Sequence, residues 1–512
     1  MDVRTMMRRT VEQWGDREAV LAGDRRLSYS EAWERGVRLA NVMIEAGMRP
    51  GDRIAVLEDN CLESVDFFVA TAVGNFVRVP LYARNSRESH AHMIGHTGSR
   101  MLVVAEHRLP EVAGLEQEIP TLEQILVRDS RYVGLLQAAS PVDPQVAISP
   151  DDLYLIRHTA GTTGKSKGVP FSHRQFLDAE RDWFYGFPPV ELGDTALHAA
   201  AISHGSGYFF IPPWSVGGRN ILLEGFDVPK VLDIMERERV AFMFLVPTML
   251  GMLARHPSAA GRDWSALKCI GIAGSPSGEA ALHHARSVFG DVIYQVYGQS
   301  EVFPVTMIGP RELFGEIPGS QPIRSAGRAF PFAELAILDV ETHEPLAIGE
   351  EGEIAAKTDG QMSEFWNDPE ATAAKIHEGW VLTGDIGKLD EHGYLYVIDR
   401  LADMIISGGF NIWPAELENV IASHPAIIEV AVVGVPDERW GETPIAVCVV
   451  AEGERVDEEE IIELCKERLG SYKKPSQVIV TTDPLPRSPV GKVLRRSLRA
   501  PYWKGRERAV AG

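Results

Sequence analysis

The chain is poor in cysteine. It has four cysteines in 512 residues, and none is part of a Cys-x-x-Cys pair: they are Cys61, Cys269, Cys448 and Cys465. A disulfide framework or a thiolate metal cluster is therefore not expected, and so few thiols fit a reducing cytoplasm.

Long hydrophobic runs are also lacking. The longest apolar stretch, residues 240–254, contains Pro247 and Thr248 and is shorter than the ~20 residues that a membrane-spanning helix needs. Residues 1–14 carry three arginines but no apolar segment of the kind found in signal peptides. We therefore expect a cytoplasmic protein with no integral membrane segment.

An excess of positive charge is missing as well. The chain has 51 lysines and arginines against 72 aspartates and glutamates, a formal net charge of -21. Nucleic-acid binding needs clustered cations that displace counterions, so this balance predicts no nucleic-acid partner. An anionic substrate would have to be held by local donors and not by the overall field.

What is present is the pattern of a folded protein with more than one core. The length is several times the usual ~100–150 residues of a domain. Helical periodicity alternates with short apolar runs, which predicts parallel sheets covered by helices. We expect helices over 29–47, 62–74 and 229–238, and strands over 53–57, 76–81, 101–105, 241–246 and 267–273.

The last part of the chain has a different pattern, that of a compact α+β unit. We expect helices over 415–423 and 458–469 and strands over 428–435, 445–450 and 477–480. The chain could pivot after residues 398–400. The sequence therefore predicts one domain over residues 1–400 and a smaller one over 401–512.

Residues 159–168 are rich in glycine, threonine and lysine and follow an apolar run at 153–156. Glycines let backbone amides approach an anion, and hydroxyls and lysines add donors and charge, so this stretch predicts a phosphate-binding loop. It is not a Walker A loop, because Thr159 stands where that pattern needs glycine. The alternative is an ordinary turn with solvated lysines. The candidate phosphate-binding residues are Thr159, Ala160, Gly161, Thr162, Thr163, Gly164, Lys165 and Lys167.

This loop resembles that of the adenylate-forming superfamily, which includes acyl-CoA synthetases, adenylation domains of peptide synthetases and firefly-type luciferases. Further motifs of the superfamily follow in the same order over roughly residues 10–500. The resemblance, strongest to the acyl-CoA synthetases, implies an α/β fold. It has a large N-terminal domain with helix-covered, mostly parallel sheets and a β-rich subdomain, followed by a small, mobile α+β domain.

A second motif is Tyr297-Gly298-Gln299-Ser300-Glu301. By the resemblance, Tyr297 stacks on adenine beside Gly298, Ser300 contacts the α-phosphate or the acyl carboxylate, and Glu301 holds Mg²⁺. A carboxylate is a suitable ligand for a hard cation such as Mg²⁺. The cation neutralises the charge that builds up on the pyrophosphate leaving group. Without the other motifs, the segment would be the end of a strand running into a loop.

Two shorter motifs complete the nucleotide site implied by the resemblance. Gly274, Ser275 and Pro276 resemble the adenine-binding loop, although alone they would be an ordinary turn. Asp385 corresponds to the aspartate that binds both ribose hydroxyls, a task that suits a carboxylate because it accepts two hydrogen bonds. Otherwise it would be a turn or N-cap aspartate.

Residues 399–418 resemble the hinge and the loop that follows it. By the resemblance, Arg400 contacts the ribose, and Gly408 and Gly409 line the tunnel for the pantetheine arm of coenzyme A. The hinge position commonly carries a charged residue, but this chain has Ala402. The effect on the second half-reaction stays open.

Two further residues are assigned to catalysis by the resemblance. Lys492, within residues 486–493, corresponds to the lysine that bridges the acyl carboxylate and ATP oxygens; otherwise it would be a solvated loop lysine. His204 corresponds to the residue bordering the acyl pocket, with a core histidine as the alternative. The predicted catalytic set is Lys492, Glu301, Ser300 and His204.

The resemblance implies an ATP-dependent acid–CoA ligase. A carboxylate attacks ATP to give an acyl-adenylate and pyrophosphate, and coenzyme A then displaces AMP. Two alternatives stay open: a separate carrier protein as the thiol acceptor, and a catalytically inert nucleotide-binding homologue. A serine hydrolase is disfavoured because Val302 stands where a nucleophile elbow needs glycine. The expected partners are the acid, ATP, Mg²⁺ and coenzyme A, and a homodimer is compatible.

The only indication of which acid is used comes from the residues expected near the acyl pocket. They are mostly apolar or aromatic, which favours a fatty or aryl acid over an amino acid: Trp183, Phe184, His204, Tyr208, Val302 and Phe303.

Overall fold

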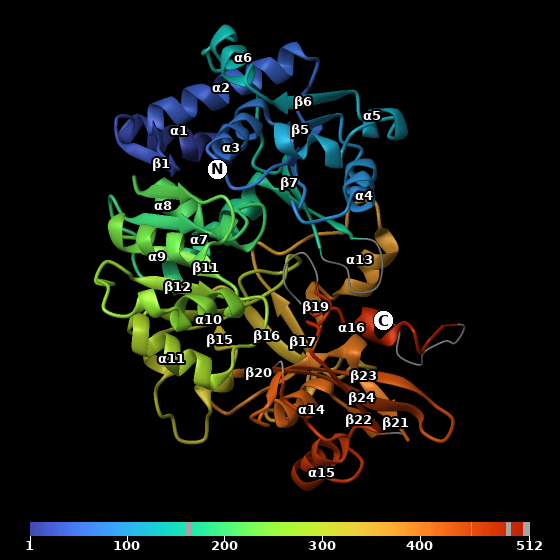
Figure 1. The fold of residues 1–512 in the computed structure, drawn as a ribbon. Coiled ribbons are helices and arrows are strands. Elements are labelled where there is room, and N and C mark those ends of the chain that lie inside the picture. Colours follow the sequence, from blue (N-terminus) through green and yellow to red (C-terminus); the bar gives the residue numbers. More distant parts are fainter. Residues whose placement is uncertain (160–165, 409, 452, 488–492, 505–512) are drawn as a thin grey trace. The chain divides into compact units, whose positions relative to one another are not determined.

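The computed structural model describes residues 1–159, 166–408, 410–451, 453–487 and 493–504 (Figure 1). Within these ranges the chain forms two compact units. The larger unit comprises residues 1–159, 166–335 and 356–381, and the smaller one comprises residues 336–355 and the described residues from 382 onward.

The first sheet of the larger unit has six strands. Neighbouring strands in this sheet are parallel, as expected for strands that alternate with helices, except for the β7–β8 pair, which is antiparallel. The order is β6 (Gln124–Arg128), β5 (Met101–Ala105), β3 (Arg53–Leu57), β4 (Val77–Pro80), β7 (Leu153–His158) and β8 (Gly168–Ser172). The first helices of the chain are α1 (Val3–Trp14), α2 (Tyr29–Glu45), α3 (Glu63–Gly74), α4 (Arg87–Thr97), α5 (Leu115–Glu118) and α6 (Tyr132–Ala138).

The second sheet of the larger unit has nine strands and is parallel at its centre. The order is β15 (Arg328–Ala329), β14 (Thr306–Ile308), β13 (Ile293–Tyr297), β12 (Cys269–Ile272), β11 (Phe242–Leu245), β9 (Thr195–His198), β10 (Arg219–Leu222), β1 (Glu18–Ala22) and β2 (Arg25–Ser28). The helices that follow along this part of the chain are α7 (His173–Gly186), α8 (Ile211–Ser215), α9 (Val228–Arg237), α10 (Pro247–Arg255), α11 (Glu279–Phe289) and α12 (Pro310–Leu313).

Buried polar contacts connect segments of the larger unit that are far apart in sequence. The Tyr29 hydroxyl, at the start of α2, donates to the carbonyl oxygen of Gly218 at 2.6 Å, and its ring packs edge-on against Trp214 at 4.8 Å. The Asn60 amide, after β3, donates to the carbonyl oxygens of His198 and Ala200 at 2.8 Å each. These bonds satisfy buried backbone groups that would otherwise cost free energy.

The end of the chain forms a sheet with its own core. The order β22 (Phe410–Ile412), β21 (Ile405–Ser407), β24 (Gly441–Val450) and β23 (Ile427–Asp437) is joined by β25 (Gln477–Thr481) beside β24. Helices α14 (Pro414–Ile421) and α15 (Glu458–Leu469) bury Leu417, Ile421 and Ile461 in its core. A short helix, α16 (Arg495–Arg499), follows.

A further five-stranded sheet is the β-rich part that the resemblance implied. It contains β16 (Glu334–Leu338), β17 (Gly352–Lys357), β18 (Ile376–His377), β19 (Trp380–Leu389) and β20 (Leu395–Arg400), with α13 (Pro369–Lys375) before β18. Strands β19 and β20 form an antiparallel hairpin in which Asp385 pairs with Arg400.

The expected fold class is confirmed, and most expected elements lie within a few residues of their predicted bounds. Helix α15 matches its predicted range, and β4 is shorter than expected. Helix α1 was not anticipated; its N-cap is Asp2, whose carboxylate accepts a hydrogen bond from the backbone of Thr5 at 2.8 Å. The division after residue 400 stays a prediction. No helix in the described ranges combines the length and apolar character needed to cross a membrane.

Gly327 marks a place where the fold tolerates no side chain. Its φ is +92°, and a Cβ there would lie 2.2 Å from the carbonyl oxygen of Met307 in β14. Gly327→Ala is expected to lower the free energy of unfolding of the larger unit by ~3 kcal/mol or more. The strain of an alanine at positive φ and the clash of its Cβ with the backbone both contribute to this loss. Gly225→Ala is the control, since its φ is +75° with open space around it. Urea unfolding followed by tryptophan fluorescence checks this; equal midpoints for the two variants would contradict it.

Candidate functional site

The ends of the candidate phosphate loop are held by a strand pair. Strand β7 ends at His158, β8 begins at Gly168, and the Thr159 backbone N–H donates to the carbonyl oxygen of Lys167 at 2.9 Å. The Lys167 ammonium lies 5.6 Å from the ring centroid of Phe365, within the range of a cation–π contact. Residues 160–165, which include Ala160, Gly161, Thr162, Thr163, Gly164 and Lys165, lie outside the described residues.

The second motif forms a tight turn at the end of β13. The Gln299 and Val302 backbones exchange hydrogen bonds of 2.9 and 3.2 Å, and Val305 N–H donates to the Tyr297 carbonyl at 3.0 Å. A Cβ on Gly298 would lie 2.8 Å from the Phe303 ring and 3.0 Å from the Val302 carbonyl oxygen, so the turn needs glycine there.

The tip of this turn places Ser300 and Glu301, both half-exposed, where a ligand could reach them. The carbonyl oxygen of Glu301 accepts a hydrogen bond from Met362 N–H at 2.8 Å, which fixes the main chain behind the carboxylate. A few residues along, Trp366 N–H donates to the carbonyl of Gly168 at 2.8 Å. Residues 362–366 therefore contact both the turn and the base of the phosphate loop.

The candidate adenine-binding loop follows the neighbouring strand. Strands β12 and β13 are parallel partners, with Ile270 opposite Ile293. Gly274 has a φ of +93°, a conformation that favours glycine, and Ser275 and Pro276 are exposed. Because carboxyl ends of parallel strands meet at one sheet edge, this loop and the Tyr297 turn lie on the same edge, where α/β proteins bind ligands.

His204 lies near the start of the phosphate loop. It precedes the 3₁₀ turn η2 (Gly205–Phe209), and its ring packs edge-on against Tyr82 at 5.3 Å. The Tyr82 hydroxyl donates to the carbonyl oxygen of His158, the last residue of β7. Burial raises the pKa of Tyr82, so this hydroxyl stays a donor. The role of His204 at the border of the acyl pocket stays a prediction.

A cavity walled by aromatic rings adjoins the turn. Tyr208 and Phe303 stack at 4.3 Å, and Trp183 packs edge-on against Phe209 at 4.1 Å. The cavity is lined by Trp183, Phe187, Tyr208, Phe209, Phe303 and Phe330, together with Glu180. Sequence reasoning anticipated Trp183, Tyr208 and Phe303 here.

Two residues expected near this pocket lie elsewhere. The side chain of Phe184 is 44% exposed and does not line the cavity, because it points away from the buried face of α7. Val302 is fully buried in a cluster with Val305, Ala356 and Val381. Glu180, in contrast, was missed, although it falls in the buried stripe of α7 at helical spacing with Phe176 and Trp183.

The smaller unit brings the two candidate ribose-binding residues together. Arg400 Nε lies 3.7 Å from Asp385 Oδ1 across the β19–β20 pair, and Asp385 is 12% exposed against 36% for Arg400. The Asp385 backbone N–H donates to Thr383 Oγ1 at 3.1 Å, and Thr383 Oγ1 donates to the Ile354 carbonyl at 2.7 Å. A carboxylate and a guanidinium thus lie side by side in a fixed hairpin.

Charged side chains hold the backbone around the candidate hinge. Asp399 accepts backbone N–H bonds from Arg400 and Ala415 at 2.8 Å each, and burial raises the pKa of Asp399 to about 6. Arg495 bonds Asp403 at 3.1 Å and Glu418 at 2.6 Å. The backbone around the hinge therefore has strong local partners.

A further predicted residue in the smaller unit is Gly408. Gly408 has a φ of +59°, and a Cβ on it would lie 2.6 Å from the Trp440 ring, so a side chain would clash. Gly409 and Lys492 lie outside the described residues. The predicted set is thus distributed over two units, with Lys167, Gly274, Tyr297 and Glu301 in the larger and Asp385, Arg400 and Gly408 in the smaller.

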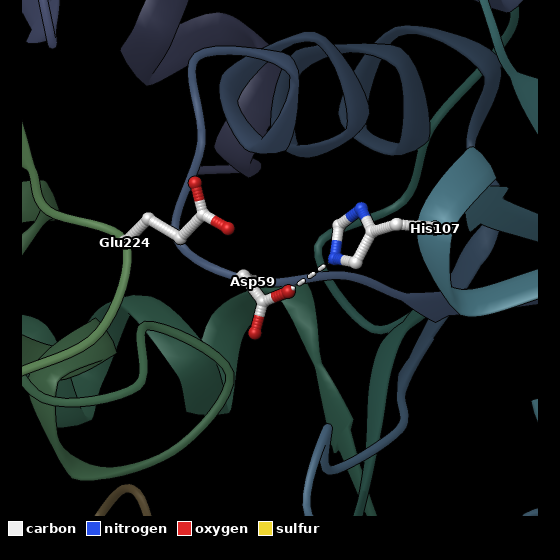
Figure 2. A group of neighbouring side chains, drawn as sticks. All are labelled: Asp59, His107 and Glu224. Atoms are coloured by element: carbon white, nitrogen blue, oxygen red, sulfur yellow. Dashed lines mark hydrogen bonds and ion pairs between the residues drawn. The ribbon is translucent and has the colours of Figure 1, made fainter.

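Figure 2 shows a separate group of potential metal ligands, Asp59, His107 and Glu224. His107 Nε2 lies 2.8 Å from Asp59 Oδ2. Arg108 also holds both oxygens of Asp59, at 2.8 and 2.6 Å, and lowers its pKa together with His107. Because a guanidinium already neutralises the central carboxylate, we assign no metal to this group.

Comparison with known proteins identifies two family models that match this chain. Residues 7–366 match the family model of AMP-binding enzymes, and residues 416–492 match the model of the AMP-binding enzyme C-terminal domain. The chain is 35% identical over 491 residues to feruloyl-CoA synthase from an Amycolatopsis species, covering 94% of this chain and 95% of the relative.

Two other proteins are similar to this chain over nearly its whole length. The fatty acid–[acyl-carrier-protein] ligase ScoC of Streptomyces coeruleorubidus is 31% identical, with 96% of this chain and 95% of the relative covered. The crystal structure of ATP-bound MatB from Rhodopseudomonas palustris superposes with a TM-score of 0.88 at 28% identity, covering 98% and 99% of the two chains.

Proposed function

The chain belongs to the family of AMP-binding enzymes, and on that premise we propose that it is an acid–CoA ligase whose acid is aromatic. Such an enzyme consumes ATP and coenzyme A and works through an acyl-adenylate. The aromatic acid is the finer part of the proposal, and the walls of the pocket support it.

One observation carries the proposal: a single turn serves two purposes. Its tip presents Ser300 and Glu301, and its continuation, Phe303 and Pro304, forms part of the aromatic cavity. An acid whose ring packs along Phe303, at the wall of this cavity, would direct its carboxylate toward the tip, where the phosphates are expected. Flat rings packed at 4–6 Å suit an aryl group, since offset and edge contacts between rings are favourable.

The proposed reaction has two displacements. A carboxylate oxygen attacks the α-phosphorus of ATP, the bond to the bridging oxygen breaks, and pyrophosphate leaves. The thiol sulfur of coenzyme A then attacks the acyl carbon, its proton passes to solvent, and AMP leaves. Holding both reactants in line accounts for much of the rate in such a reaction.

Individual residues have distinct roles in this proposal. Glu301 fits Mg²⁺ because its carboxylate is accessible while the main chain behind it is fixed by Met362. The ion would neutralise charge on the departing pyrophosphate. Ser300 would donate to the α-phosphate or the carboxylate, Lys167 would neutralise phosphate charge, and Tyr297 would stack on adenine.

The residues of the smaller unit would act on the sugar and the thiol. Asp385 would accept hydrogen bonds from both ribose hydroxyls, with Arg400 beside it. Gly408, where a side chain would clash with Trp440, would leave room for the pantetheine arm. Lys492 would bridge the carboxylate and ATP oxygens.

The proposal is tested by acid-dependent exchange of labelled pyrophosphate into ATP. We expect aryl acids to support exchange at lower concentrations than straight-chain fatty acids of equal carbon number. The reverse order would overturn the aromatic assignment, and exchange with no acid of either class would overturn the ligase function.

A carrier-protein acceptor is the second candidate, because of the 31% identity to ScoC. Acid-dependent AMP release distinguishes the two. We expect release to be stimulated by coenzyme A alone. Stimulation by a phosphopantetheinylated carrier protein and not by coenzyme A would favour the second candidate.

Asp385→Asn is expected to raise the KM for ATP at least ~10-fold with little change in the KM for the acid. The asparagine amide keeps one acceptor oxygen of the carboxylate but loses its negative charge. A hydrogen bond to a charged group is worth about 1.5–3 kcal/mol, so ATP should bind more weakly. Glu351→Gln is the control, since that carboxylate is exposed and pairs with Lys388 of β19 at 3.0 Å. Equal rises in both Michaelis constants would contradict the ribose role.

A further inference from the structure

The aromatic cavity contains one carboxyl group, that of Glu180 on α7. Its side chain lines the cavity, and the residue is only 3% exposed. Among the residues that the structure describes, none lies within hydrogen-bonding distance of either Glu180 oxygen. A buried polar group without a partner costs about 1–3 kcal/mol, so its presence needs a reason.

The charges around Glu180 favour a neutral partner. Arg157 and Arg78, both buried, interact electrostatically with it, while burial raises its pKa well above the ordinary value. Arg157 donates to the Tyr208 hydroxyl and lies 4.5 Å from the centroid of that ring. Two guanidinium groups nearby would repel an ammonium group, whereas an oxygen of Glu180 can accept a hydrogen bond whether or not the carboxyl is ionised.

A donor without an acceptor lines the same cavity. The indole N–H of Trp183 is buried and has no partner among the described residues. Glu180 supplies an acceptor and Trp183 a donor, and a hydroxyl is the small neutral group that satisfies both. The cavity has a volume of about 10 Å³, close to the room that one water-sized group occupies.

We propose that Glu180 is a specificity-determining residue that accepts a hydrogen bond from a hydroxyl on the ring of the acid substrate. This inference rests on the proposed function and narrows it to hydroxyaryl acids. Phe303 belongs both to the cavity wall and to the turn that carries Glu301. The ring would therefore lie along Phe303, with its hydroxyl at Glu180 and its carboxylate toward Ser300.

The experiment compares three acids with one aromatic skeleton that carry hydrogen, hydroxyl or methoxy at the same ring position. For the wild-type enzyme we expect kcat/KM in pyrophosphate exchange to be at least ~10-fold higher for the hydroxyl acid than for the other two. A methoxy group cannot donate, and a site built for a hydroxyl leaves its own groups unpaired when that hydroxyl is missing.

Substitutions at Glu180 test whether this residue causes the preference for the hydroxyl acid. Glu180→Leu, which removes the acceptor and keeps an apolar side chain of similar volume, is expected to lose the preference while still using the unsubstituted acid. Glu180→Gln, which keeps an acceptor, is expected to retain part of it. Asp178→Asn on the same helix is the control, because Asp178 pairs with Arg181 at 3.2 Å and does not line the cavity.

The possible failures are distinguishable. Equal kcat/KM for the hydroxyl and unsubstituted acids in the wild type overturns the inference and assigns Glu180 to a bound water or to internal charge balance. A preference that survives in Glu180→Leu also overturns it. Absence of exchange with every acid would instead overturn the proposed function. The wild-type comparison does not depend on any variant folding.

Discussion

Lys492→Ala is expected to reduce acid-dependent pyrophosphate exchange about 10²–10³-fold. Charge develops on oxygens around the α-phosphorus as the carboxylate attacks, and removing one preorganised donor from such a site typically costs this much. Since the lysine is assigned to the adenylation step, the loss should fall on kcat and not only on the KM of either substrate. Initial rates over a matrix of ATP and acid concentrations check this.

The control for this variant is Lys466→Ala on α15. That lysine is exposed and pairs with Glu463, three residues away on the same helix, at 2.7 Å. It should leave exchange unchanged, and both variants should unfold at the wild-type midpoint. Near-normal exchange in Lys492→Ala would remove Lys492 from its assigned role and shift charge stabilisation to Lys167 and the metal.

Glu301→Gln is expected to lower exchange about 10²-fold at ordinary Mg²⁺ concentrations. An amide keeps the shape and a carbonyl oxygen but removes the charge that a hard cation prefers. The metal would then bind more weakly, so raising Mg²⁺ should recover part of the lost rate. The measurement is exchange rate against Mg²⁺ concentration at saturating acid.

Glu116→Gln on the exposed face of α5 is the matched control, and its Mg²⁺ dependence should equal that of the wild type. Because the turn of Glu301 is fixed through backbone bonds, the substitution should not change its shape. A rate loss that is the same at every Mg²⁺ concentration would contradict the metal role and leave Glu301 with an electrostatic or structural one.

Periodicity in the sequence was sufficient to predict the regular elements that bury a face. Residues 458–469 carry acidic residues at the start, basic ones at the end and buried Ile461 and Cys465 between, and the helix has these bounds. Strand β5 is a continuous apolar run that also matches. Short exposed strands such as β2 and β15 carry little such signal, since few of their side chains are buried.

Motif resemblance located candidate nucleotide residues, because their positions along the chain are set by backbone requirements. Gly298 and Gly274 illustrate this: one has no room for a Cβ, and the other has a positive φ. A backbone position that requires glycine can be recognised from the glycine in the sequence. The domain division at 400 stays a prediction.

The polar residues in the cavity and next to it could not be found that way. Arg157, Glu180 and Tyr208 are far apart in sequence and belong to β7, α7 and η2. The available signal was a glutamate within the apolar stripe of α7, three residues before Trp183. A stripe position indicates burial, but only the fold reveals that the buried carboxyl faces aromatic rings and not a salt-bridge partner.

The hinge shows a further limit of the sequence. Ala402 lacks the charged side chain common at this position, yet the surrounding backbone is held by others: Arg499 donates to the Ala402 carbonyl at 3.2 Å. The neighbouring Asp403 pairs with both Arg495 and Arg499. Arg495 and Arg499 of α16 therefore place positive charge next to Ala402.

The central claim is that a carboxylate oxygen of the acid becomes bonded to the α-phosphorus of ATP. The most direct test uses acid labelled with ¹⁸O in its carboxylate, together with ATP and coenzyme A, and mass spectrometry of the products. The account predicts one ¹⁸O in each AMP formed and none in pyrophosphate. Formation of ADP with ¹⁸O in inorganic phosphate, or unlabelled AMP, would contradict it.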